Sequence, residues 1–376
     1  MGIINIHKIL DEVRLLGCSD LHFTNAIAPV VRLNGTLRTM RSQYPEMDEE
    51  EILDIVNQMT NEAQQTSVNN HHDTDFSFQT KSGYRHRVNI YFQKGKPAIA
   101  IRLLRNDIPT LEDLMLPPIL ADFSMRPRGL VLVTGPTGSG KSTTLAAMID
   151  FVNLNRSAHV ITVEDPIEYV HDHKRCMINQ REIGDDVPNF ALALRAALRE
   201  DPDVILVGEM RDFETIQAAV TAAETGHLVM STLHTTSAAD TINRIIDVYP
   251  EHQQQQIRTQ LANNLVGIIS QTLIPKRDGT GRIAVMEILN VTDAISAMIR
   301  DNKIHLIQSA IQTGKQQGMM SLDQELARLV YKNVINEVDA LEKCLDKQEF
   351  YRFLTQMGGA PSGGMTSVQQ GGVGIE

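Results

Sequence analysis

Residues 129–142 read GLVLVTGPTGSGKS, and this stretch decides the fold. Its second half matches the pattern G-x-x-x-x-G-K-[ST] at every fixed position. Its first half is apolar and rich in valine and leucine, which predicts a short buried strand. After Lys141 the chain reads STTLAAMIDFV, with Leu145, Ile149 and Val152 at helical spacing. Strand, glycine-rich loop and helix in this order predict an α/β domain with a phosphate-binding loop.

The chemistry of a bound nucleotide accounts for the residue types in this loop. Glycines allow successive backbone N–H groups to turn toward an anion, and the helix N-terminus adds a positive partial charge. Lys141 would reach the β- and γ-phosphates, and the Ser142 hydroxyl would ligate Mg²⁺. A chance turn is the alternative, and the flanking strand and helix favour the nucleotide site. The predicted nucleotide-binding residues are Gly135, Pro136, Thr137, Gly138, Ser139, Gly140, Lys141, Ser142 and Thr143.

Composition narrows the class of protein. A chain of 376 residues with 42% apolar and 22% charged residues is typical of a globular protein with two domains. Its formal net charge of −11 argues against nonspecific nucleic-acid binding as the main task. The three cysteines are far apart in sequence, which favours free thiols in a reducing cytosol over a metal or redox site.

The hydropathy pattern predicts no segment that inserts into a membrane. No apolar stretch is long enough to span a bilayer, and the N-terminus MGIINIHKIL lacks the features of a secretory signal. We therefore expect a cytoplasmic protein that is not inserted into a membrane and that reaches the membrane through a partner.

The chain divides into four predicted segments. Residues 1–105 mix helical and strand patterns, as in an α+β domain, with Asn34-Gly35 as a tight hairpin turn. Residues 106–118 contain three prolines and form a predicted linker. Residues 119–355 alternate apolar strands with helices, which predicts a doubly wound parallel sheet with ligands at the carboxyl ends of its strands. Residues 356–376 are rich in glycine and are predicted to be a disordered tail.

One strand of the first domain alternates strictly between apolar and polar residues. Over residues 84–93, Val88, Ile90 and Phe92 alternate with polar neighbours such as Arg87. This pattern predicts an antiparallel sheet with one buried and one exposed face.

Two acidic positions follow predicted strands of the second domain. The strand in ITVEDPIEY, residues 161–169, leads into Glu164, where a carboxylate could polarise the attacking water. The strand 204–207 leads into Glu209, which could hold Mg²⁺ or orient the nucleophile. An acidic turn at a strand end is the structural alternative for Glu164. The sequence leaves open which glutamate is the general base, and we assign the base to Glu164 and the metal site to Glu209.

A third strand end carries a histidine. The segment GHLVMSTLHTTSA, residues 226–238, would deliver His234 to the same edge of the sheet. There it could sense the γ-phosphate. A core histidine satisfied by backbone groups is the alternative.

In this order, the four segments resemble the secretion ATPase superfamily. That family is defined by a Walker A loop, an Asp box, a Walker B segment and a His box, matched here by residues 135–142, 161–168, 204–209 and 231–235. Further similar stretches are SDLH at 19–22, RVN at 87–89, ISQTLIPKRDGTGR at 269–282 and IQTGKQQGMMSLDQEL at 311–326. Within the superfamily the chain is most similar to the retraction ATPases of type IV pili, and the resemblance covers nearly all of it.

This resemblance implies a homohexameric ring that hydrolyses ATP with Mg²⁺. Each subunit would combine a PAS-like N-terminal domain with a RecA-like C-terminal domain. Arg87 and Arg102 match arginines that act on the nucleotide of a neighbouring subunit. The implied task is pilus retraction for twitching motility, carried out at the cytoplasmic face through a platform protein of the inner membrane.

Several alternatives stay open. The retraction family commonly carries AIRNLIRE, whereas this chain has Ser296 and Ala297 in place of an arginine and an asparagine. An accessory or assembly ATPase, or a scaffold with little turnover, is therefore an alternative, although the chain lacks the tetracysteine motif of the assembly motors. A nucleic-acid motor on the same fold is another, against which the acidic charge and the absence of tryptophan count.

Overall fold

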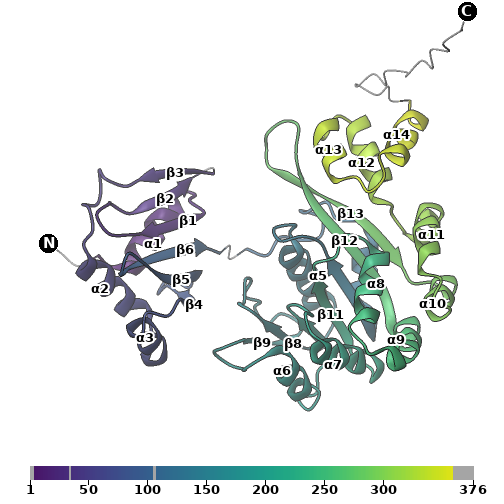
Figure 1. Cartoon of the computed structure of the whole chain (residues 1–376), viewed down its shortest axis with the longest axis horizontal. Coiled ribbons are helices and arrows are strands. Elements are labelled where there is room, and N and C mark those ends of the chain that lie inside the picture. The colour runs from purple at the N-terminus through teal and green to yellow at the C-terminus, as the bar shows by residue number, and fades with distance from the viewer. Residues whose placement is uncertain (1–3, 34, 105–106, 359–376) are drawn as a thin grey trace, which may run out of the picture. The chain divides into compact units, whose positions relative to one another are not determined.

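The computed structural model of the chain describes residues 4–33, 35–104 and 107–358 (Figure 1). The chain divides into two compact units, which are Met1–Ile108 with Ile161–Ala193 and Pro109–Val160 with Leu194–Glu376. The described part of the predicted linker, residues 107–118, contains no helix or strand. The predicted tail lies outside the described residues from residue 359 onward, and the last helix reaches Gln356.

The N-terminal part of the chain forms a six-stranded antiparallel sheet with the order β3-β2-β1-β6-β5-β4. The predicted hairpin turn includes Asn34, which lies outside the described residues, and the strands on either side pair with Leu33 opposite Thr36. The elements are α1 (Ile6–Leu15), β1 (Asp20–Phe23), β2 (Val30–Leu33), β3 (Thr36–Thr39), α2 (Glu49–Met59), α3 (Glu62–Asn69), β4 (Thr74–Gln79), β5 (Arg85–Gln93) and β6 (Lys96–Leu103).

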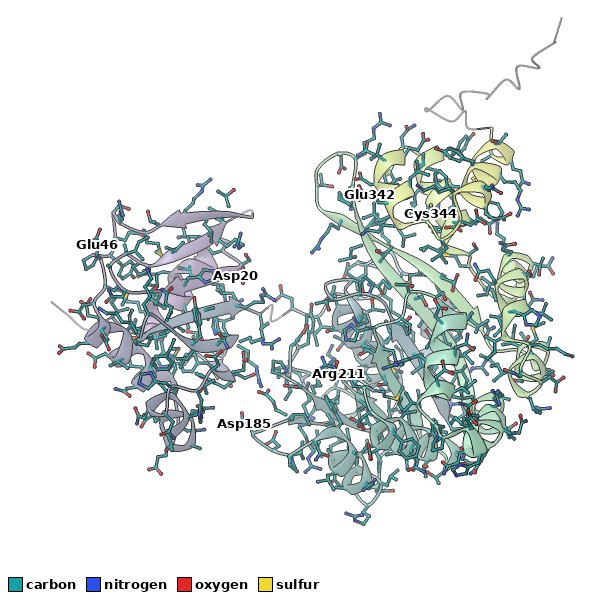
Figure 2. The ribbon with its side chains drawn as sticks, viewed as in Figure 1. Asp20, Glu46, Asp185, Arg211, Glu342 and Cys344 are labelled. Atoms are coloured by element: carbon teal, nitrogen blue, oxygen red, sulfur yellow. The ribbon has the colours of Figure 1, made fainter. Side chains whose placement is uncertain are left out.

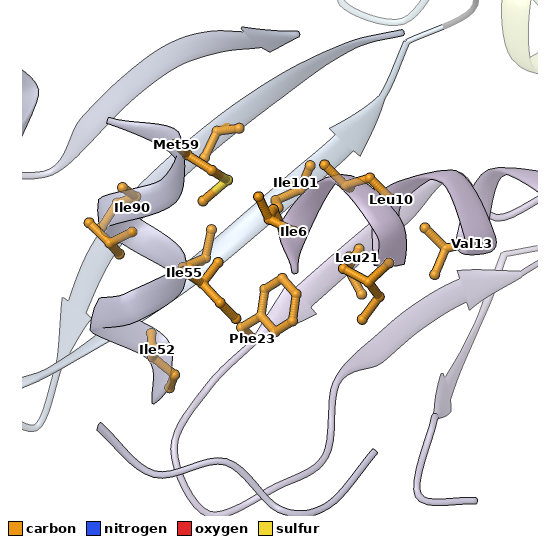
Figure 3. Close-up of a cluster of buried hydrophobic side chains, with 14 of the residues drawn as sticks. Ile6, Leu10, Val13, Leu21, Phe23, Ile52, Ile55, Met59, Ile90 and Ile101 are labelled. Atoms are coloured by element: carbon orange, nitrogen blue, oxygen red, sulfur yellow. The ribbon is translucent and has the colours of Figure 1, made fainter. Parts of the chain in front are cut away.

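Helices α1 and α2 share a hydrophobic core with this sheet (Figure 3). Ile6 of α1 and Ile55 of α2 are both 0% exposed and lie in one cluster with Phe23 of β1. Val88 and Ile90 of β5 are also fully buried, as the alternating pattern predicts. The apolar sides of the helices thus cover one face of the sheet, which leaves the polar residues of β5 and β6 on the other.

The larger sheet has seven strands in the order β13-β12-β7-β11-β10-β8-β9. Strand β7 lies between β11 and β12 and is parallel to both, which agrees with the predicted α/β architecture. The helices and strands from residue 119 to this sheet's last strand are α4 (Ile119–Ser124), β7 (Gly129–Thr134), α5 (Lys141–Asn155), β8 (His159–Glu164), β9 (Met177–Glu182), α6 (Phe190–Ala197), β10 (Val204–Val207), α7 (Phe213–Glu224), β11 (Leu228–Leu233), α8 (Ala238–Asp247), α9 (Glu251–Asn264), β12 (Leu265–Pro275) and β13 (Arg282–Asn290).

The sheet differs from the sequence prediction at its edge. Strand β13 runs antiparallel to β12, with Ser270 opposite Glu287, and not parallel as the alternation of elements implied. The reason is the short connection between them, because a parallel pair needs a crossover of a dozen or more residues. Strands β9 and β12 were not predicted at all.

Five α-helices among the described residues follow the β12–β13 hairpin, and the last three of them pack against it. The five helices are α10 (Asp293–Arg300), α11 (Ile307–Thr313), α12 (Leu322–Tyr331), α13 (Glu337–Lys343) and α14 (Lys347–Gln356). Leu326 of α12 and Phe350 of α14 are buried in one cluster with Ile274 of β12. Of the three cysteines, Cys18 and Cys176 are buried and Cys344 is partly exposed. Across the described ranges, no helix combines the length and the hydropathy that a bilayer crossing requires.

Candidate nucleotide-binding site

The glycine-rich loop joins β7 to α5 in the conformation that its sequence requires. Gly135 and Gly140 have φ angles of 143° and 89°, in the region that favours glycine. Helix α5 begins at Lys141, and its N-cap, Gly140, makes no side-chain hydrogen bond to the first turn. A 15-residue helix with no side chain capping its N-terminus suits an anionic ligand there.

Two side chains of the loop point to the same ligand. Lys141 Nζ donates to the carbonyl oxygens of Gly135 at 2.9 Å and Pro136 at 3.1 Å, so the ammonium group lies over the loop. Ser139 Oγ is buried and has no hydrogen-bond partner among the described residues. A buried hydroxyl without a partner and a lysine held across a glycine loop fit a polyphosphate.

The Walker B and His segments end at the same edge of the sheet as the loop. Because β10, β11 and β7 are parallel neighbours, Glu209, His234 and Gly135 all follow the carboxyl ends of their strands. The hydroxyl of Ser231 donates to the carbonyl of Val207 at 2.8 Å, which fixes β11 against the end of β10. The structure therefore brings together these three parts of the predicted site.

Glu209 is held by two basic side chains. Arg211 Nε lies 2.7 Å from Glu209 Oε2, and His234 Nε2 lies 3.5 Å from the same oxygen. The Arg211 side chain is 71% exposed (Figure 2), whereas that of Glu209 is 16% exposed. No role for Arg211 was predicted from the sequence, although Arg211 follows Glu209 by only two residues.

These groups also fit a magnesium ion that is shared with a nucleotide. Mg²⁺ in nucleotide sites usually binds one or two protein ligands, phosphate oxygens and water. Ser142 is exposed at the start of α5, and Glu209 offers a carboxylate at the same sheet edge. Among the described residues there is no cluster of three or more acidic, histidine or cysteine side chains that would form a metal cage of its own.

Glu164 is the last residue of β8 and accepts two hydrogen bonds. Thr162 Oγ1 donates to Glu164 Oε1 at 2.6 Å, and Gln180 Nε2 donates to the same oxygen at 3.1 Å. Burial raises the pKa of Glu164 to about 7, although these two hydrogen bonds lower it in part. A carboxyl group with a pKa near neutrality is suited to exchanging a proton in catalysis.

Arg87 and Arg102 lie next to each other on the exposed face of the N-terminal sheet. Arg87 of β5 is directly opposite Arg102 of β6, which is directly opposite Asp20 of β1. Arg102 Nε donates at 3.1 Å to Oδ1 of Asp20 (Figure 2), and the Arg102 side chain is 67% exposed. Like charges directly opposite each other destabilise a sheet. Two adjacent arginines with one carboxylate therefore form a surface suited to an anion.

One residue near the loop was missed by sequence analysis. Gln271 of β12 is 4% exposed and makes hydrogen bonds with both ends of the segment that contains Lys141. The only local signal was in the stretch ISQTLIPKRDGTGR, where Gln271 is the largest of three consecutive polar residues between apolar ones.

Comparison with known proteins agrees with this geometry. The sequence profile of the type II/IV secretion system protein family matches residues 3–339. The chain is 46% identical over 347 residues to the type IV pilus retraction ATPase PilT of Pseudomonas aeruginosa, covering 92% of this chain and 100% of that protein. It is 48% identical over 307 residues to a twitching motility protein of Neisseria gonorrhoeae, covering 82% of each.

A solved structure is similar over the same length. The crystal structure of the pilus retraction motor PilT with bound ADP superposes with a TM-score of 0.88 at 44% identity, covering 93% of this chain and 99% of that one. The fold, the phosphate-binding loop and these similarities agree with one another, and the chain belongs to the type II/IV secretion system protein family.

Proposed function

We propose that this chain is an ATP-hydrolysing motor that powers the retraction of type IV pili. The observation that carries the proposal is the phosphate-binding loop, with Lys141 across it and with Glu209 and His234 at the same sheet edge. The chain is 46% identical to a pilus retraction ATPase over the full length of that protein, which supports retraction of the pilus over its assembly.

Each part of the site has a distinct task in this proposal. The loop amides and Lys141 bind the phosphates and stabilise the charge that develops during phosphoryl transfer. Glu164 accepts a proton from the attacking water, for which its raised pKa suits it. His234 lies beside Glu209 at the end of β11, where it senses whether the γ-phosphate is present.

Mg²⁺ belongs to the same proposal. Ser142 and Glu209 would hold it, and it would supply charge neutralisation at the phosphate oxygens. Glu209 is engaged by Arg211 in this structure, so the metal and the arginine compete for one carboxylate.

The assembly is a homohexamer in which Arg87 and Arg102 act on the nucleotide of the neighbouring subunit. Support comes from their adjacent, exposed positions and from the family resemblance. The ring works at the cytoplasmic face of the membrane by acting on a platform protein of the pilus machinery, and it does not bind nucleic acid.

Replacing Lys141 by alanine tests the enzyme activity. The purified Lys141→Ala protein should hydrolyse ATP about a hundredfold more slowly or worse, because a preorganised charge at the phosphates is lost. Hydrolysis at the parental rate would overturn the proposal. Deleting the gene tests the direction of work, since loss of twitching with excess surface pili is expected and loss of all pili would point to assembly.

An accessory motor is the second candidate, and one observation favours it. Ser296 and Ala297 lie in α10 at positions where the retraction family commonly has charged or amide side chains. The rate of ATP hydrolysis by the purified protein separates the two candidates, because an accessory subunit with little turnover would hydrolyse ATP slowly. Deleting the gene of an accessory subunit would leave twitching in part intact, whereas deleting the gene of the main motor would abolish it.

A further inference from the structure

The Gln271 side chain connects the two segments of the chain on either side of Lys141. Gln271 Nε2 lies 2.6 Å from the carbonyl oxygen of Ser139, and Thr144 Oγ1 lies 2.7 Å from Gln271 Oε1. A carbonyl only accepts, so the amide nitrogen must face Ser139 and the amide oxygen must face the Thr144 hydroxyl. All three residues are at most 4% exposed, so the two bonds are shielded from water.

The backbone of Gln271 also limits the shape of the loop. Strand β12 pairs in parallel with β7, with Ser270 opposite Thr134, so Gln271 lies beside the first loop residue. A Cβ added to Gly135 would come 2.2 Å from the Gln271 carbonyl oxygen, and one added to Gly140 would come 2.8 Å from Gln271 Nε2. The loop is thus in close contact with Gln271 at both of its ends.

We infer that Gln271 is a positioning residue, which holds the phosphate-binding loop and the first turn of α5 in the geometry that binds the nucleotide. The inference rests on the proposed nucleotide site and adds a residue to it. A side chain in this place must donate and accept at once. Glutamate at neutral pH cannot donate to Ser139, and an apolar residue leaves both the carbonyl and the hydroxyl without a partner.

The test measures nucleotide affinity and not only turnover. Gln271→Met keeps an unbranched side chain of similar volume and removes both bonds. In the full-length protein it should raise the Kd of a fluorescent ATP analogue and the KM for ATP about tenfold, with kcat changed less than threefold. A merely structural role would lower the number of active molecules and hence the maximal rate, with Kd and KM unchanged.

Variants of Thr144 keep the test decisive if Gln271→Met does not fold. Thr144→Val removes the donor and should weaken binding about threefold to tenfold. The conservative Thr144→Ser keeps the hydroxyl and should restore affinity to within about twofold. Thr272→Val is the matched control, because Thr272 is next to Gln271 on β12 and alternate side chains leave opposite faces of a strand.

The outcomes separate the inference from the proposed function. If Lys141→Ala weakens binding of the analogue and both Gln271→Met and Thr144→Val bind like the parent, the role of Gln271 is wrong and the nucleotide site stands. If Lys141→Ala also binds like the parent, the nucleotide site itself is wrong, and the role of Gln271 is lost with it.

Discussion

Glu164 carries a carboxyl group that its surroundings keep partly protonated near neutral pH. Burial raises its pKa to about 7, and the charge of Glu168 acts in the same direction. A general base must be deprotonated, so the active fraction increases as pH rises through this pKa. We expect kcat to rise about tenfold per pH unit below pH 6 and to level off above pH 8, measured under saturating ATP and Mg²⁺.

Two variants check that Glu164 is the group that titrates. Glu164→Gln should lose most of the activity at every pH. Glu168→Gln removes a neighbouring negative charge and should move the midpoint of the profile to lower pH. A flat profile between pH 5.5 and 8.5 in the parental protein would assign the base to another residue.

Arg211 pairs with Glu209, the carboxylate that is proposed to hold Mg²⁺. Its side chain is largely exposed, so the ion pair with Glu209 contributes only about 0–1 kcal/mol to stability. Arg211→Ala should therefore leave the melting temperature unchanged and lower the Mg²⁺ concentration for half-maximal activity a few-fold.

Arg352→Ala is the matched control, because Arg352 pairs with Glu349 on α14 and its side chain is also more than half exposed. A higher Mg²⁺ requirement in Arg211→Ala would mean that the arginine helps to form the metal site.

At the level of elements, α12 is tied to the start of α14 by one buried carboxylate. Asp323 is 3% exposed and accepts from the amides of Leu345 at 2.7 Å and Asp346 at 3.0 Å. Asp323→Ala leaves two amides without this acceptor, which should destabilise the protein by about 1–3 kcal/mol. Thermal unfolding measures the loss. Asp301→Ala, which alters an exposed ion pair with Lys303, should change stability by less than about 0.5 kcal/mol.

Local sequence signals predict some of these elements, whereas contacts between distant strands are not predicted by them. The β7–α5 loop was predicted correctly because its glycines, lysine and flanking periodicities are all local signals. The antiparallel direction of β13 follows from its short connection to β12, a strand that was not predicted. The contacts of Gln271 depend on the pairing of β12 with β7. That pairing joins residues 136 positions apart, such as Thr134 and Ser270, and no local pattern encodes it.

The position of Arg87 opposite Arg102 could be predicted only in part from local sequence. Alternation along β5 predicts that Arg87 is on the polar face, and Arg102 follows from the same rule in β6. Their direct opposition depends on the register of the hairpin.

At the scale of the whole molecule, the proposed ring makes a prediction about mixed subunits. Lys141→Ala and Arg102→Ala should each be inactive alone. If the arginine acts on a neighbour's nucleotide, each active site takes its lysine from one subunit and its arginine from the next. In an equal mixture of the two variants, about a quarter of the interfaces then combine a wild-type lysine with a wild-type arginine. The mixture should therefore regain up to about a quarter of the parental ATPase rate after subunit exchange.

No recovery in the mixture would place the arginine and the nucleotide in the same subunit. Arg38→Ala provides the control. Arg38 is exposed on β3 opposite Val31, and Val31 belongs to the buried face, so Arg38 is outside the row that contains Arg102. This variant should hydrolyse ATP like the parent.

The distribution of the three thiols has a practical consequence. Cys18 and Cys176 are buried, so a maleimide dye would attach mainly to Cys344, at the end of α13 (Figure 2). Burial raises the pKa of the Cys344 thiol, so coupling would proceed best at mildly alkaline pH. The unmodified chain can thus carry a single fluorophore per subunit, and energy transfer between copies would report the moment when subunits join.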